Sequence, residues 1–162
     1  MASAREQIHR PASYEEDGYT WAMEQAALLR ARRLDRIDIE NIAEEIENLG
    51  KSFANELRSR YGTLVMHLLK WQLQPERRSN SWAGTIRRER REIGRHLRQN
   101  PGLKSRREEL FTDAYDSDDA VIETNLPPTR FPETCPYALD QVMDPGFWPG
   151  GEAIPKRVPR LR

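Results

Sequence analysis

The sequence has one cysteine, no net charge and no long hydrophobic run. Cys135 has no second cysteine to pair with, which excludes a disulfide within the chain. The 26 basic residues balance the 26 acidic ones, so no overall field attracts nucleic acid or acidic membranes, and only local patches need to be considered. The longest apolar run, 64–69, is interrupted by His67 and is far shorter than the roughly 20 residues of a membrane span. We therefore expect no membrane insertion.

Export signals, strand patterns and internal repeats are also absent from the sequence. Residues 1–13 hold no apolar segment of the kind that a signal peptide needs, so we expect a cytoplasmic protein with a flexible N-terminus. Only 37% of the residues are hydrophobic and 32% are charged, which favours amphipathic helices around a narrow core. The length of 162 residues suits one domain, which we place at 14–149, with a basic mobile tail at 150–162.

Apolar residues recur at steps of three and four over residues 38–73 and predict one long amphipathic helix with a buried stripe. The members of this stripe are Ile42, Ala43, Ile46, Leu49, Phe53, Leu57, Tyr61, Leu64 and Leu68. The register continues through Gly50, but Gly50 followed by Ser52 is also a stop and restart signal, so two helices remain an alternative. Pro75 ends the segment because it lacks an amide proton and keeps Gln74 out of helical geometry.

The same spacing predicts four shorter helices, at 19–33, 82–99, 103–124 and 137–143. Ser81 is the expected N-cap of the second of these. After Asn125, closely spaced prolines exclude long regular elements. The sequence thus predicts an all-α fold: a four- to five-helix bundle with one long central helix and an irregular, Pro-rich C-terminal segment. Trp21, Trp71 and Trp82 are expected to be substantially buried.

Three carboxylates on the long helix are candidate metal ligands. Glu40, Glu44 and Glu47 fall within about 60° of one another at 100° per residue. Helical di-metal sites use Glu-x-x-His pairs, however, and neither His67 nor His96, the histidines of the predicted helices, has a glutamate three positions earlier. A solvated acidic edge is therefore favoured, and we predict neither a metal nor another cofactor.

Polar residues also lie near the apolar face of the long helix. Arg60 and His67 are close to that face, and Glu56 precedes Arg60 by four residues. A buried donor without a partner costs about 1–3 kcal/mol, so these groups need partners. A structural network of Glu56, Arg60 and His67 is the favoured interpretation. The alternative is a ligand pocket with His67, Trp71 and Gln72 along one wall.

Arginines are concentrated between residues 77 and 107, where eleven basic residues stand against two acidic ones. Five of them form a stripe on the 82–99 helix opposite its apolar face: Arg87, Arg88, Arg91, Arg95 and Arg98. Guanidinium groups bind phosphates bidentately, so the stripe is a candidate anion site. Residues 108–123 hold seven acids and no base, however. Pairing of the two blocks, within the chain or between subunits, is therefore favoured over a solvated face and over nucleic acid.

Sequence motifs of catalysis are missing. The chain has no serine nucleophile elbow, phosphate-binding glycine loop, zinc-ligand spacing or dinucleotide fingerprint. Cys135 precedes Pro136 at the start of a short predicted helix, where the helix dipole can lower the pKa of a thiol. No histidine or carboxylate partner can be assigned to Cys135 by spacing, so an ordinary structural cysteine is favoured.

Three segments together resemble the bacterial "domain of unknown function 29" family. They are ENIAEEIENLG at 40–50, HLLKWQLQPERRSNSWAGTIRRERREI at 67–93 and FPETCPYALDQVMDPGFWP at 131–149. The resemblance extends from about residue 14 to 149 and implies a small all-helical cytoplasmic protein. It implies no activity and no catalytic residues, so it assigns no role to any position.

The function that these observations favour is a non-enzymatic interaction or self-association module, whose partner is another copy of the chain or another protein. Nucleic-acid or phosphate binding through the arginine stripe is the first alternative. A metal- or small-ligand-binding enzyme centred on Glu44, Glu47 and His67 is the second.

Overall fold

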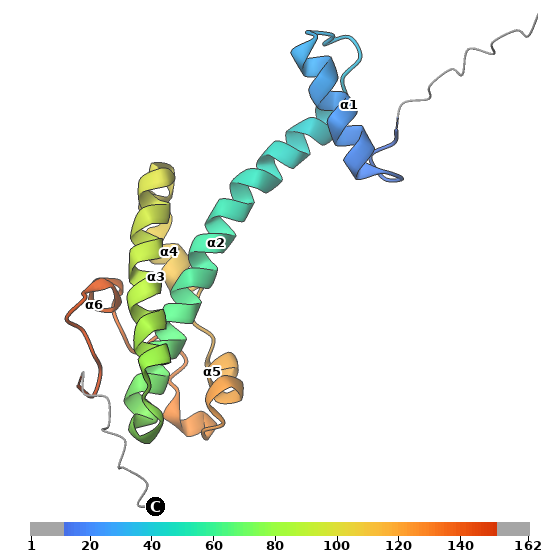
Figure 1. Ribbon diagram of the computed structural model, residues 1–162. Coiled ribbons are helices and arrows are strands. Elements are labelled where there is room, and N and C mark those ends of the chain that lie inside the picture. Colours follow the sequence, from blue (N-terminus) through green and yellow to red (C-terminus); the bar gives the residue numbers. More distant parts are fainter. Residues whose placement is uncertain (1–11, 152–162) are drawn as a thin grey trace, which may run out of the picture. The chain divides into compact units, whose positions relative to one another are not determined.

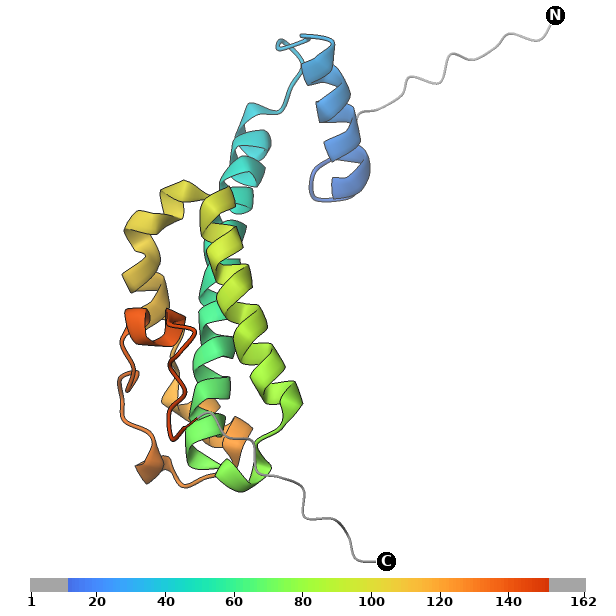
Figure 2. The same ribbon diagram turned by 60° about the vertical axis from the view of Figure 1, so that its left-hand side comes forward.

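The computed structural model describes residues 12–151, which form six α-helices and three short 3-10 helices (Figures 1 and 2). The α-helices are α1 (Gly18–Arg30), α2 (Ile39–Leu73), α3 (Asn80–Gln99), α4 (Arg107–Thr112), α5 (Ser117–Thr124) and α6 (Leu139–Met143). No strand occurs between residues 12 and 151, which confirms the predicted all-α fold. No helix in this range combines the length and apolarity that crossing a membrane requires.

The chain divides into two compact units, residues 1–51 and 52–162, of which 12–51 and 52–151 are described. We call these two described parts the N-terminal unit and the core unit. The start of α2 belongs to the first and the rest of α2 to the second. The flexible N-terminus at 1–13 and the basic tail at 150–162 lie almost wholly outside the described residues. The single domain at 14–149 stays a prediction.

The helix α2 confirms the prediction of one long helix over 38–73. It is continuous from Ile39 to Leu73, including Gly50. Asp38 precedes its first turn, and Oδ1 of Asp38 accepts a hydrogen bond from the amide of Asn41 at 3.3 Å. Gln74, the residue before Pro75, has left the helical conformation, with φ −128° and ψ 59°. This is expected for a residue that precedes a proline.

The core unit is built on the second half of α2. Five side chains at steps of three and four are at most 1% exposed: Leu57, Tyr61, Leu64, Leu68 and Trp71. α3 runs beside this part of α2 in both views (Figures 1 and 2) and contributes the buried Ile86 and Ile93. The Phe111 ring of α4 meets the Tyr61 ring edge to face, with 5.5 Å between the centroids. The predicted buried stripe is therefore buried in this unit.

The helix α3 begins at Asn80, two residues before the predicted start at residue 82. Ser79, in extended conformation, is the N-cap, and its hydroxyl accepts a hydrogen bond from the amide of Trp82 at 3.3 Å. Ser81 lies in the first turn, so the prediction for Ser81 was wrong. Trp82 is half-buried against the core, whereas Trp21 and Trp71 are buried as expected.

The predicted helix at 103–124 is three separate elements. They are the 3-10 helix Pro101–Arg106, α4 and α5. The break between α4 and α5 has a local cause. Oδ1 of Asp116 accepts hydrogen bonds from the amides of Asp118 at 2.8 Å and Asp119 at 3.2 Å, so Asp116 is the N-cap of a new helix, α5. Asn125 then ends α5 in the left-handed conformation, at φ 57°. Capping by a short acidic side chain thus outweighs the apolar periodicity.

The C-terminal segment is irregular, as predicted, and contains only the 3-10 helix Pro128–Arg130 and α6. Arg90 of α3 holds this segment: its guanidinium donates to the carbonyl oxygens of Val142 and Phe147 at 2.7 Å and of Pro145 at 3.3 Å. Burial lowers the pKa of Arg90, which still makes charge-assisted bonds to the three carbonyls.

Arg78 holds the following residues in a similar way. It follows the 3-10 helix Pro75–Arg77, and its guanidinium donates to the carbonyl oxygens of Trp71 at 2.8 Å and Gly150 at 2.9 Å. Gly150 has φ 76°, and a Cβ atom there would lie 2.7 Å from Nη2 of Arg78. Only glycine therefore fits this position without a shift of the arginine.

Candidate functional site

The predicted polar network forms around Arg60, with different members. Nε and Nη2 of Arg60 donate to Oε1 of Glu56 at 3.0 and 2.8 Å, and Nη1 donates to Oε2 of Glu89 in α3 at 3.2 Å. Nδ1 of His96 lies 3.7 Å from Oε2 of Glu56, and Nε2 of His96 lies 2.8 Å from the carbonyl oxygen of Phe53. The Arg60 guanidinium lowers the pKa of Glu56. This network joins α2 to α3.

His67 has no bond to this network among the described contacts. Its Nδ1 lies 2.9 Å from the carbonyl oxygen of Thr63 in its own helix, and burial lowers the pKa of its imidazole. The members that the sequence analysis missed are Glu89 and His96. A helical wheel would have found them, because they share the face of Ile86 and Ile93 at steps of three and four.

The sequence analysis proposed a pocket wall of His67, Trp71 and Gln72. Trp71 is instead a core residue. The Trp71 side chain is fully buried, its ring centroid is 4.9 Å from that of Trp148, and the Arg78 guanidinium lies 5.1 Å from its ring centroid. Gln72 is exposed and accepts a hydrogen bond from the hydroxyl of Tyr137. These contacts are those of packing.

A small cleft of about 120 Å³ opens beside the polar network, lined in part by Glu56, Arg60, Glu92, Arg95 and His96. Its charged groups are paired with one another, Arg95 with Glu92 and Arg60 with Glu56. Every buried side-chain nitrogen and oxygen in the described chain has a hydrogen-bond partner. The network therefore acts as a structural link between two helices.

The five arginines of the predicted stripe are all exposed on α3. Arg88 donates to Glu89 at 3.0 Å and Arg95 pairs with Glu92, both on α3 itself, while the guanidinium of Arg87 lies 5.2 Å from the Trp148 ring centroid. In the acidic block, Glu109 pairs with Arg106 at 2.6 Å and Glu123 with Lys70 at 2.7 Å. The Arg106–Glu109 pair joins the two blocks where they meet in the sequence, whereas the partners given for Arg88 and Arg95 lie on α3 itself. Pairing between subunits stays a prediction.

The candidate metal ligands Glu40, Glu44 and Glu47 are exposed, and Glu47 lies 3.7 Å from Lys51. Within residues 12–151, no three histidine, cysteine, aspartate or glutamate side chains are grouped so that they could hold a metal ion. Cys135 is half-buried, and burial raises the pKa of its thiol, opposite to the shift that activates a nucleophile.

The N-terminal unit carries most of the exposed apolar side chains. Seven of the nine large hydrophobic residues that are exposed in the described chain belong to it: Tyr19, Met23, Leu29, Leu34, Ile39, Ile46 and Leu49. Ile46 is 65% exposed and Leu49 is 56% exposed, although both belong to the stripe that the sequence predicts to be buried. The prediction of a buried stripe is therefore wrong for this part of α2, because only the crossing with α1 covers it within the N-terminal unit.

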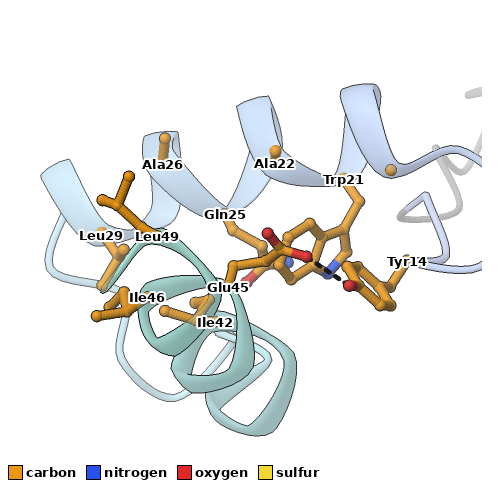
Figure 3. A pocket seen from close by; sticks show the side chains of 11 residues that line it. Tyr14, Trp21, Ala22, Gln25, Ala26, Leu29, Ile42, Glu45, Ile46 and Leu49 are labelled. Carbon is orange, nitrogen blue, oxygen red and sulfur yellow. Dashed lines mark hydrogen bonds between the residues drawn. The ribbon is translucent and has the colours of Figure 1, made fainter. Parts of the chain in front are cut away.

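Two partly buried polar contacts join α1 to Asp38, the residue before α2, and Figure 3 shows Trp21 and Gln25 on the side of α1 that faces α2. Nε1 of Trp21 donates to Oδ2 of Asp38 at 3.3 Å, and Oε1 of Gln25 accepts a bond from the amide of Asp38 at 2.9 Å. Trp21 and Gln25 are the only described residues of this unit that are buried. Other residues of the facing surfaces, such as Ala26 and Ile42, are half-buried.

An apolar groove of about 680 Å³ lies between the two helices. On the α1 side its lining includes three small residues and a leucine, Gly18, Ala22, Ala26 and Leu29. On the α2 side it includes three branched residues, Ile42, Ile46 and Leu49. Figure 3 shows Leu29, Ile46 and Leu49 at one end and Tyr14 at the other.

One carboxylate lines this groove. Oε1 of Glu45 accepts a hydrogen bond from the hydroxyl of Tyr14 at 2.5 Å, drawn in Figure 3, and this bond raises the pKa of Tyr14 to about 12. The Tyr14 ring also meets the Trp21 ring edge to face, with 4.8 Å between the centroids. Tyr14 therefore closes one end of the groove and orients Glu45.

The arrangement suits the binding of a helix. Ile39, Ile42, Ile46 and Leu49 follow one another at alternating steps of three and four, the pattern of a coiled-coil seam. The small residues on α1 leave room for close approach of a third helix. Helix-in-groove recognition uses such a stripe of apolar anchors.

A comparison with family models finds a match to the model described as domain of unknown function DUF29, over residues 13–148. This match confirms the resemblance noted in the sequence. No curated protein and no solved structure matches the chain. The family's description states no activity, so the interpretation of the groove depends on its own chemistry.

Proposed function

We propose that this chain, which belongs to the family described as domain of unknown function DUF29, is a protein-interaction module that binds a helix of its partner. The partner helix occupies the groove between α1 and α2, where it covers Ile46 and Leu49. The observation that carries the proposal is the contiguous apolar lining of this groove, which is open in the described chain.

Burial of the groove supplies the driving force. Full burial of an isoleucine or leucine side chain contributes about 1.5–3 kcal/mol relative to its exposed state, so two half-exposed anchors contribute roughly half of that each. Monomeric proteins rarely expose contiguous apolar patches that have no function. A docked helix also gives the N-terminal unit the apolar core that Trp21 and Gln25 alone do not provide.

The polar groups of the groove support binding over catalysis. Tyr14 and Glu45 are bonded to each other, and Gln25 is bonded to the backbone of Asp38. General acid–base or nucleophilic chemistry needs a group with its reactive atom directed at a substrate. The groove instead presents aliphatic side chains, with its polar groups at the crossing of the helices and beside Tyr14.

Selection from a library of displayed helical peptides tests the proposal without knowledge of the partner. We expect enriched peptides that carry apolar residues at steps of three and four and lose binding to the Ile46→Asp chain. Ile122→Asp is the matched control, because Ile122 is 76% exposed but lies on α5 in the core unit. Enriched peptides that bind both variants equally, or no enrichment, would refute the proposal.

A second candidate function is binding of a polyanion along α3, since its five arginines are exposed and the partners of Arg88 and Arg95 lie on the same helix. Arg91 and Arg98 are the residues to change, because Arg87 contacts Trp148. Replacement of both by glutamate should abolish binding of single-stranded nucleic acid, and binding to the unchanged chain should fall steeply with salt. Unchanged binding in the variant, or none in the original chain, would rule this function out.

A further inference from the structure

We infer that the groove between α1 and α2 is occupied by the N-terminal unit of a second copy of this chain. The start of α2 of each copy lies in the groove of the other, so that one symmetric contact covers both apolar faces. The inference rests on the proposed function and names its partner. Its basis is the extent of the apolar surface around the groove and the position of the charged residues.

The apolar face of α1 extends beyond the groove. At 100° per residue, Tyr19 lies about 60° around the helix from Ala22, which lines the groove. Met23 likewise lies about 60° from Ala26, another lining residue. Tyr19 is 77% exposed and Met23 is 55% exposed. Neither belongs to the groove lining, so a single helix seated in the groove does not account for them.

The apolar face of α2 also extends beyond the groove. Ile39 precedes Ile46 by seven residues, lies about 20° from it around the helix and is exposed. Ala43 and Gly50, which are exposed as well, lie about 60° and 40° from Ile46. Such small residues allow close approach of another helix. Both helices thus present apolar faces wider than the groove, and two helices are needed to cover them.

The charged residues of α2 do not oppose a second copy. Those of residues 39–49 are all glutamates and lie about 100° or more from Ile46 around the helix: Glu40, Glu44, Glu45 and Glu47. Charges directly beside an apolar seam select the partner and repel an identical copy. Two α2 helices that meet along Ile39 and Ile46 do not place these carboxylates against one another.

The area of the exposed apolar residues suits a dimer. Six large residues of 18–30 and 39–51 are 42% to 77% exposed: Tyr19, Met23, Leu29, Ile39, Ile46 and Leu49. At about 100 Å² for an aliphatic side chain and about 200 Å² for tyrosine, they offer roughly 400 Å² on each copy. Interfaces are about 60% apolar, so two copies would bury roughly 1,400 Å² in total. Specific interfaces bury about 1,200–2,000 Å².

Sedimentation of the full chain between about 1 and 200 μM tests the inference. We expect an equilibrium of monomer and dimer with a dissociation constant in the micromolar range, because the interface is near the lower end of the specific class. Below this range the chain is a monomer, and unfolding measured there reports the stability of the monomer.

Three variants locate the contact. Ile46→Asp should raise the dissociation constant at least about tenfold, because it buries a charge in the interface. Met23→Asp should do the same, although Met23 lies outside the groove lining. Ile122→Asp, on α5 of the core unit, is the matched control and should leave the dissociation constant unchanged. Circular dichroism checks that the variants stay folded.

The outcomes separate this inference from the proposed function. A chain that stays monomeric up to about 200 μM, or a dimer that Ile46→Asp or Met23→Asp leaves intact, would overturn the pairing of N-terminal units. The proposed function would stand in that case if selected peptides bind the original chain and lose binding to Ile46→Asp. Peptides that bind both equally would refute the proposed function and, with it, this inference.

Discussion

The N-terminal unit and the core unit cover the same kind of helical stripe to very different extents. In the core unit, Leu57, Leu64 and Leu68 of α2 are fully buried within the unit. In the N-terminal unit, Ile46 and Leu49 continue the same spacing and are more than half exposed. Apolar periodicity therefore identifies the face of a helix that is to be covered, and it does not say whether the same chain supplies the cover.

Two leucines of α2 give the strongest contrast between the units. Leu64→Ala should lower the free energy of unfolding by about 2–5 kcal/mol, because it leaves a cavity in a closed core. Leu49→Ala removes the same atoms from a groove and should lower it by less than about 1 kcal/mol. Urea unfolding of both variants measures the difference. Equal losses would mean that Leu49 is covered within the chain.

Two neighbouring arginines of α3 sharpen the comparison between buried and exposed charge. Arg90→Ala removes the donor of three backbone carbonyls and should destabilise the core unit by about 3 kcal/mol. Arg91→Ala, on the exposed face, should change stability by less than about 0.5 kcal/mol. Thermal unfolding of the pair tests this, and similar melting temperatures would show that Arg90 does not hold residues 142–147.

The link between α2 and α3 should depend on pH. Arg60 lowers the pKa of Glu56 below its ordinary value of 4.5, so the pair stabilises the folded state at neutral pH. That stability is present above the ordinary pKa and is lost as the pH falls through the lower pKa of the folded state. Arg60→Met should therefore cost about 1 kcal/mol at pH 7 and less at acidic pH. A deficit that is independent of pH between 7 and 3 would argue against this role for Glu56.

The smallest effect on stability is expected in the N-terminal groove. Ile46→Asp should change the free energy of unfolding by less than about 0.5 kcal/mol, because the side chain is 65% exposed. The same change should abolish binding of a helical peptide selected for the groove, since it places a charge at the centre of the apolar lining. A large loss of stability would show that Ile46 is a core residue, and retained binding would place the peptide elsewhere.

Helix periodicity and proline positions predict the fold well and predict local capping less well. The long helix, the limits set by Pro75 and Asn125, and the irregular C-terminal segment follow from residue spacing and from the missing amide of proline. Ser79 in place of Ser81, and the break at Asp116, depend on which short polar side chain reaches an amide. Several nearby residues can cap, so the spacing alone does not select one.

The candidate site was less predictable than the fold. The sequence analysis assigned Ile46 and Leu49 to a buried core and sought function in Glu44, His67 and the arginines. The difference arises because burial depends on contacts that residue spacing does not contain. The apolar anchors over 39–49 are visible in the sequence and point to a partner only once the exposure of α2 is known.

Amide hydrogen exchange of the full chain, with and without a helical peptide selected for binding to it, tests the central claim most directly. The account predicts that the peptide slows exchange in 18–29 and 39–49 and leaves the amides of α3 and α5 unchanged. Protection that appears along α3 instead, or on no segment despite saturation with peptide, would contradict the claim that the groove between α1 and α2 is the binding site.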